Sequence, residues 1–298
     1  AVNAALAYGW ILGRLGLPEL GIAGAGWATV YGSSASAVLA LVLMFLPPYR
    51  AEYATVSGWR FEAPLFRRLL RFGVPNGVVV GLETLAFTLF TFFVARLGEV
   101  PAAATSIAFT LNLLVYMPVI GIGQAVGVLV GQRLGEDRPD LAERATWTGL
   151  TIALLLTSAA VVLYLLAPST LVLPFESDGN PAQWQQVAAL VPVLLRFVAV
   201  YALFDTTNAV FSFALRGAGD TRFVSGASLA ISWSVLVVPV WLACTRGWGL
   251  LWAWGFASGY TVVLAFTLLT RFRQGAWKEM RVIEPDLVGA RQPDPRAG

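Results

Sequence analysis

The sequence has 298 residues, of which 57% are hydrophobic and only 12% are charged, and its mean hydropathy is +0.71. A soluble domain carries about 25% charged residues, so this composition indicates a polytopic membrane protein. Histidine is absent and Cys244 is the only cysteine, which excludes His/Cys metal sites, a Ser-His-Asp triad and an internal disulfide. The net charge of +3 reflects basic residues beside apolar stretches, a pattern of membrane topology and not of nucleic-acid binding.

The first apolar stretch begins at Ala1, without a methionine or a signal-peptide pattern, and we interpret the chain as the C-terminal part of a longer protein. Residues 1–46 are expected to hold a partial helix, a turn rich in Gly and Pro, and a full span. The polar segment 47–73 is predicted to be a cytoplasmic linker between two lobes. Its end, 62–71, could lie as an amphipathic helix on the membrane surface.

Six further spans are predicted from apolar stretches of about 20 residues. They cover residues 74–95, 103–130, 145–166, 193–215, 223–243 and 249–270. The expected fold is therefore all-α and membrane-spanning, with a six-helix lobe over residues 74–273. The tail 274–298 is polar and Pro-rich and is expected to be disordered and cytoplasmic.

The orientation follows from the basic residues, which are enriched in cytoplasmic segments. Sixteen of the 20 Lys and Arg residues lie in one alternating set of polar segments, and only Arg14, Arg96 and Arg246 lie in the other. The first set comprises residues 47–73, 131–144, 216–222 and the tail from Arg271. We therefore expect a multi-pass protein of the inner (plasma) membrane with a cytoplasmic C-terminus.

Two acids lie within predicted spans, Glu83 in 74–95 and Asp205 in 193–215. A carboxylate at the centre of a bilayer costs roughly 3 kcal/mol or more unless it is neutral, paired or hydrated. Each acid is about ten residues from the cytoplasmic end of its span, which predicts a common depth of roughly 15 Å. Two acids at one depth suggest a shared site.

The neighbours of both acids support a cation site. Tyr201, Asp205, Asn208 and Ser212 share one helix face, at i−4, i, i+3 and i+7. Around Glu83, the same kind of spacing places Asn76 and the aromatic Phe87 and Phe90. Carboxylates supply negative charge and aromatic rings attract cations through their faces.

These acids could bind H⁺, or Na⁺ through their oxygens, and the sequence does not choose between the two ions. No other cofactor is expected. The alternative interpretation is that each acid only hydrogen-bonds to a neighbouring helix. That alternative is weakened because no buried Lys, Arg or His is predicted beside Glu83 or Asp205.

Three motifs resemble those of the multidrug and toxic compound extrusion (MATE) transporters. They are MPVIGIGQAVGVLVGQRLG at Met117–Gly135, LRGAGDTR at Leu215–Arg222 and GLPELGIAGAGWAT at Gly16–Thr29. The resemblance implies that the chain begins in the fifth of twelve helices and contains the whole C-terminal lobe. It also implies a partner in the missing N-terminal lobe. The Gly residues of the first motif are interpreted as helix-packing positions.

Within this family the chain resembles the NorM-like branch. Glu83 then corresponds to the acid of the seventh helix, Asp205 to that of the tenth, and Tyr201 to the aromatic residue one turn before it. The resemblance implies antiport, in which cationic amphipathic drugs leave in exchange for H⁺ or Na⁺. An isolated chain without most of one lobe is expected to be inactive.

Two other functions were weighed. A lipid or oligosaccharide flippase of related architecture would carry anionic cargo and would need a basic cavity, whereas the predicted cavity is acidic. A membrane-embedded enzyme would need a catalytic dyad or metal ligands, and without histidine only an acid pair remains. We therefore predict a transporter and not an enzyme.

Overall fold

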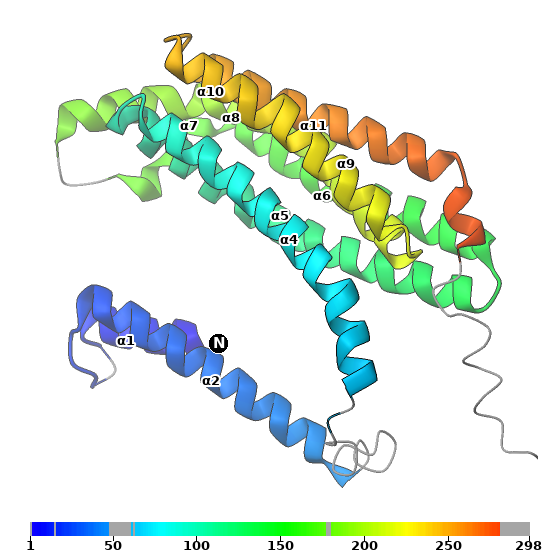
Figure 1. The fold of residues 1–298 in the computed structure, drawn as a ribbon. Helices are drawn as coiled ribbons and strands as arrows, with labels where there is room; N and C mark the ends of the chain where they lie inside the picture. The colour runs from blue at the N-terminus through cyan, green and yellow to red at the C-terminus, as the bar shows by residue number, and fades with distance from the viewer. Residues whose placement is uncertain (1, 15, 48–60, 62, 177–179, 281–298) are drawn as a thin grey trace, which may run out of the picture. The chain divides into compact units, whose positions relative to one another are not determined.

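The computed structural model of the protein describes residues 2–14, 16–47, 61, 63–176 and 180–280 (Figure 1). These residues form helices joined by short turns and contain no β-strand. The α-helices are α1 (Val2–Leu12), α2 (Gly21–Phe45), α4 (Ala63–Ala95), α5 (Glu99–Gly135), α6 (Pro139–Leu166), α7 (Pro168–Val172), α8 (Pro181–Gly217), α9 (Thr221–Ile231), α10 (Val238–Thr245) and α11 (Leu250–Arg273). Short helical turns η1 (Leu173–Phe175), η2 (Ser232–Val237) and η3 (Ala276–Glu279) complete the described chain.

Seven helical segments of the described chain are long and apolar enough to cross a bilayer. They correspond one to one with the seven spans predicted from the sequence, so the all-α, membrane-spanning class is confirmed. The helices α5 and α8 extend beyond their predicted spans because hydropathy marks only the apolar part of a helix. At the start of α8, for example, Asn180 Oδ1 accepts a hydrogen bond from the Ala182 amide at 3.1 Å and caps a polar first turn.

The predicted surface helix at 62–71 is not a separate element. Helix α4 begins at Ala63 and continues to Ala95, so the basic residues of this segment extend the span that carries Glu83. Gly73, Pro75, Asn76 and Gly77 lie between the basic segment and the apolar one, and the helix continues through all four.

The chain divides into two compact units, Ala1–Phe72 and Gly73–Gly298. In the first unit, α1 and α2 pack against each other. Most of the predicted linker 47–73 lies outside the described residues, as does the tail from residue 281 onward. The linker and the disordered tail therefore stay predictions.

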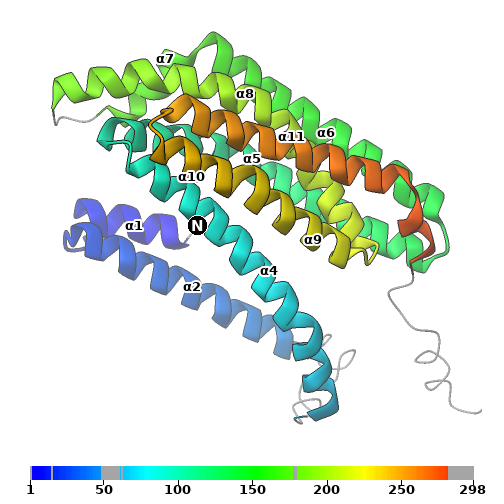
Figure 2. The ribbon, with the colours of Figure 1, turned by 45° about the horizontal axis from the view of Figure 1, so that its top comes forward.

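Helix α8 is the centre of the second unit and packs against α5, α6 and α11. Figures 1 and 2 show α11 (orange) running alongside α9 and α10 (yellow), and these helices are in contact. The apolar core consists of two clusters, one around Trp254 and Leu194 and one around Phe211 and Leu268. The cluster around Trp254 borders the cavity described below.

The span that contains α9 and α10 is interrupted by the π-helical turn η2. Pro239 follows this turn and has no N–H, so the carbonyl of Val235 lacks its ordinary helical donor. A π-turn is the wider arrangement that such an interruption favours. Its residue Leu236 lines the cavity, so the irregular turn lies at the site.

Candidate functional site

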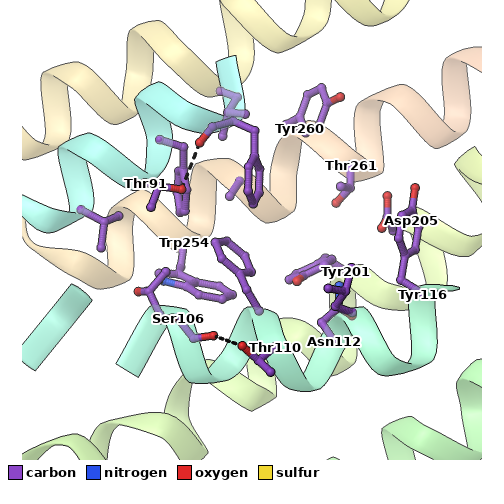
Figure 3. A pocket seen from close by; sticks show the side chains of 18 of the residues that line it. Thr91, Ser106, Thr110, Asn112, Tyr116, Tyr201, Asp205, Trp254, Tyr260 and Thr261 are labelled. Atoms are coloured by element: carbon purple, nitrogen blue, oxygen red, sulfur yellow. Dashed lines mark hydrogen bonds between the residues drawn. The ribbon is translucent and has the colours of Figure 1, made fainter. Parts of the chain in front are cut away.

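A cavity of about 570 Å³ opens within the second unit, between α4, α5, α8 and α11. Its size falls within the range of about 300–1,000 Å³ that is typical of small-molecule sites. Seven aromatic side chains line it: Phe87, Phe90, Phe109, Tyr116, Tyr201, Trp254 and Tyr260. Thr91, Ser106, Thr110 and Asn112 add polar groups (Figure 3).

Trp254 of α11 is the fixed aromatic element of this lining. Its Nε1–H donates to the Thr105 hydroxyl on α5 at 3.2 Å, and the side chain is fully buried. Its ring centroid lies 5.1 Å from that of Phe109 and 6.3 Å from that of Phe90, the latter pair edge to face. Aromatic pairs at such spacings contribute about 0.5–1.5 kcal/mol beyond their buried area, so this wall is rigid.

Asp205 of α8 is the one acid among the described residues that line the cavity. The Asn208 side chain hydrogen-bonds to it from the next turn, and Tyr201 lines the cavity one turn earlier. Figure 3 shows the Asp205 carboxylate beside the Tyr116 ring of α5. Within the described chain, no basic side chain interacts with Asp205, so its negative charge is not balanced locally.

Glu83 of α4 is half-buried and is not part of the cavity lining. The hydroxyl of Ser228 on α9 hydrogen-bonds to its carboxylate, and the positive charge of Arg216 on α8 acts on it. Within the described chain, no ion pair joins Glu83 to a basic side chain.

Two tyrosines lie near both acids. Tyr116 and Tyr260 each interact electrostatically with Asp205 and with Glu83. The structure thus brings Glu83 and Asp205 to one polar region without joining them in a single carboxylate pair. In the described part of the chain, no three acidic, Cys or His side chains gather as a metal site.

Of the remaining predicted site residues, some line the cavity and others do not. Phe87 lines the cavity and stacks near Phe109, with ring centroids 5.1 Å apart. Ser212 is half-buried and lies outside the lining. The side chain of Asn76 is outside the described part of the structure. The role of each as a cation-site residue stays a prediction.

For Asn112, a mid-helix amide, the sequence left cavity lining and helix packing open, and it did not identify the other residues that α5 and α11 contribute. Thr105, Phe109, Asn112 and Tyr116 recur at i, i+4, i+7 and i+11, so one face of α5 carries polar and aromatic groups. This is the same signal that singled out the stripe around Asp205. The signal is harder to see on α5 because this face of the helix carries no charged residue between Thr105 and Tyr116.

The family model MatE matches residues 75–242, more than half of the chain, including both acids. The chain belongs to the MATE family. This MATE chain is 32% identical over 275 residues to the probable multidrug resistance protein NorM of Mesorhizobium japonicum, covering 91% of this chain and 58% of that protein. It is 33% identical over 266 residues to the multidrug resistance protein NorM of Burkholderia vietnamiensis, covering 88% of this chain and 56% of that protein.

Solved transporters share the fold of this MATE chain. An outward-facing multidrug resistance MATE family transporter of the MOP superfamily superposes with a TM-score of 0.75 at 18% identity, over 93% of this chain and 61% of that chain. A MOP superfamily transporter from Pyrococcus furiosus gives a TM-score of 0.76 at 18% identity over the same shares. The MATE chain thus spans about three fifths of the proteins it matches. It is an integral membrane protein of a transporter family, not of an enzyme family.

Proposed function

We propose that this chain forms the cargo-binding lobe of an antiporter that exports organic cations in exchange for H⁺ or Na⁺. The observation that carries the proposal is the cavity of about 570 Å³, which is lined by seven aromatic rings and one carboxylate, Asp205. Aromatic faces attract cations by about 0.5–2 kcal/mol each, most strongly where water is excluded. A planar or branched aromatic cation would be attracted both by the negative charge of Asp205 and by the faces of the aromatic rings.

Exchange follows from competition for the same negative charge. When H⁺ or Na⁺ binds at Glu83 and Asp205, the carboxylates are neutralised and their attraction for the cationic cargo is lost. Linkage requires the reverse as well, so a bound cargo lowers the affinity for the ion by the same factor. In this proposal the ion enters from outside and the cargo leaves outward, with the basic segments and the C-terminus on the cytoplasmic side of the inner membrane.

A flippase for anionic lipids or oligosaccharides is the alternative. Such a cargo would require basic groups, and none of the described residues that line the cavity is Lys or Arg. The cavity chemistry therefore favours a cation over an anion.

The test is efflux of tetraphenylphosphonium from drug-sensitive cells that express the intact gene product. The variants Asp205→Asn and Glu83→Gln should each abolish efflux while membrane levels stay unchanged. Glu176→Gln is the matched control, because Glu176 is exposed and lies outside the cavity. Undiminished efflux in the Asp205→Asn variant would contradict the proposed antiport function.

A further inference from the structure

A second cavity, of about 380 Å³, lies in this unit at the end where α5 and α8 begin. Its volume is large enough for a small organic molecule. The lining combines apolar residues with the polar side chains of Ser106, Asn180 and Gln183 and the aromatic rings of Phe175 and Trp184. None of the described residues that line it is charged, and the function proposed above does not use it.

The second cavity adjoins the main cavity along α5. The main cavity takes Ala102, Ser106 and Phe109 from this helix, at i, i+4 and i+7. The second cavity takes Ala103, Ser106 and Ile107, at i, i+3 and i+4. These two sets occupy neighbouring faces of one helix, and Ser106 belongs to both. Ser106 is small and exposed, so no bulky side chain of α5 separates the two cavities at this position.

A carboxylate lies directly behind the lining of the second cavity. Gln183 Nε2 donates to Glu99 Oε2 at 2.9 Å, which joins the first turns of α8 and α5. Because a carboxylate only accepts hydrogen bonds, the NH₂ group of Gln183 faces Glu99, and its carbonyl oxygen is left for another donor. No described residue donates to that oxygen, and no basic side chain of the described chain forms an ion pair with Glu99.

The Ser106 hydroxyl is a second acceptor in this cavity. One turn later, the Thr110 hydroxyl donates to the Ser106 main-chain carbonyl at 2.8 Å, as hydroxyls within helices commonly do (Figure 3). The hydroxyl of Ser106 itself donates to no described residue, so both its lone pairs and its proton are available. Two hydrogen-bond acceptors, two aromatic rings and a carboxylate behind them match a ligand that carries N–H donors, a positive charge and an apolar body.

We propose that the second cavity is a separate binding site for protonated aromatic amines, which holds a cationic cargo beside the main cavity before it is released. This inference rests on the function proposed above, because it gives that cargo a second site. The ammonium group would donate to the Gln183 carbonyl and the Ser106 hydroxyl, within the attraction of the Glu99 charge. The carbon skeleton would pack against Trp184, and cargo would pass between the two cavities beside Ser106.

The test is calorimetric titration of the solubilised intact gene product with 2-phenylethylammonium, which should show two sites. Asp205→Asn should weaken one of them. Glu99→Gln should weaken the other roughly fivefold through the lost charge, and Gln183→Leu should weaken it tenfold or more through the lost acceptor. Glu99 is exposed, so its variant tests the site without disturbing the core. Asp140→Asn and Gln185→Leu change exposed residues outside both linings and should leave both affinities unchanged.

Two further variations separate this inference from the proposed function. Phenyltrimethylammonium has the charge and the ring but no N–H donor, so Gln183→Leu should change its affinity by less than twofold. Ser106→Phe should weaken both sites for 2-phenylethylammonium, because this residue lines both cavities. A single site in the wild type, or a change of less than twofold in both Glu99→Gln and Gln183→Leu, would overturn the second site and leave the proposed function intact. If Asp205→Asn weakens neither site, the proposed function fails instead.

Discussion

Gly217 of α8 packs directly on the backbone of Gly127 of α5, so the two helices are in main-chain contact. A neighbouring contact repeats this arrangement, because a Cβ on Gly131 would lie 3.2 Å from the Gly217 carbonyl oxygen. One turn earlier on α5, the Phe213 ring fills the space beside Gly123. The Gly stripe of α5 is thus a packing surface against α8, as its sequence spacing suggested.

The first prediction concerns this contact. Gly217→Ala should lower the free energy of unfolding by about 1–3 kcal/mol, because the added methyl group can be accommodated only by separating α5 and α8. Gly121→Ala on α5 is the control, since nothing lies within 4 Å of a Cβ placed there. The measurement is thermal unfolding in detergent, followed by tryptophan fluorescence. Equal melting temperatures for both variants would contradict the contact.

The second prediction concerns a buried ion pair between α9 and α11. Arg271 Nε donates to Asp220 Oδ2 at 2.8 Å, and the Asp220 side chain is only 6% exposed. Arg271→Gln should cost about 3 kcal/mol of stability, because it leaves the buried carboxylate unbalanced. The pair of Arg133 and Glu136 is exposed and joins residues of one helix, so Arg133→Gln should cost less than about 1 kcal/mol. Similar losses in both variants would mean that burial does not set the strength of the Arg271 pair.

The helices could be predicted from the sequence because each span is a continuous apolar stretch between polar turns. The π-helical turn η2 could not be predicted in this way. A π-turn depends on which backbone carbonyls accept hydrogen bonds, and hydropathy carries no information about that. The continuity of α4 was also missed, because basic residues before an apolar run were taken for a surface element. Hydropathy locates the membrane-embedded part of a helix but not its ends.

The site was predicted only around its acids. Asp205 and Tyr201 were identified because a charged residue within an apolar helix can be recognised from the sequence alone. Both residues line the cavity. The contributions of Trp254 and Tyr260 depend on how α11 packs against α8, which a single sequence does not report.

The third prediction concerns Trp277, at the end of the described chain. Its side chain is 1% exposed, stacks on Phe272 with centroids 4.7 Å apart and donates from Nε1 to the Phe272 carbonyl at 2.8 Å. Trp277→Ala should therefore cost about 3–5 kcal/mol and release the segment that follows α11. Limited proteolysis should cut within residues 274–280 in the variant but not in the wild type. Trp248→Ala, at a residue 45% exposed, should leave the cleavage pattern unchanged.

The fourth prediction separates cation attraction from shape in the cavity, and it presupposes the proposed function. Phe109 contacts the rings of Phe87, Phe90 and Trp254 at centroid distances of 5.1, 5.8 and 5.1 Å. Phe109→Leu keeps an apolar side chain but removes the π face. Affinity for tetraphenylphosphonium should fall roughly threefold to fivefold, as expected for a loss of about 0.5–1 kcal/mol.

The neutral probe triphenylphosphine oxide distinguishes the two explanations of such a loss. It has aromatic rings but no net charge, so its affinity should change by less than twofold in the Phe109→Leu variant. Phe92→Leu is the control for the substitution itself, because Phe92 is 48% exposed and stacks with Arg96 outside the lining. If both probes lose affinity equally, Phe109 contributes only volume, and the selectivity for cations must come from Asp205 alone.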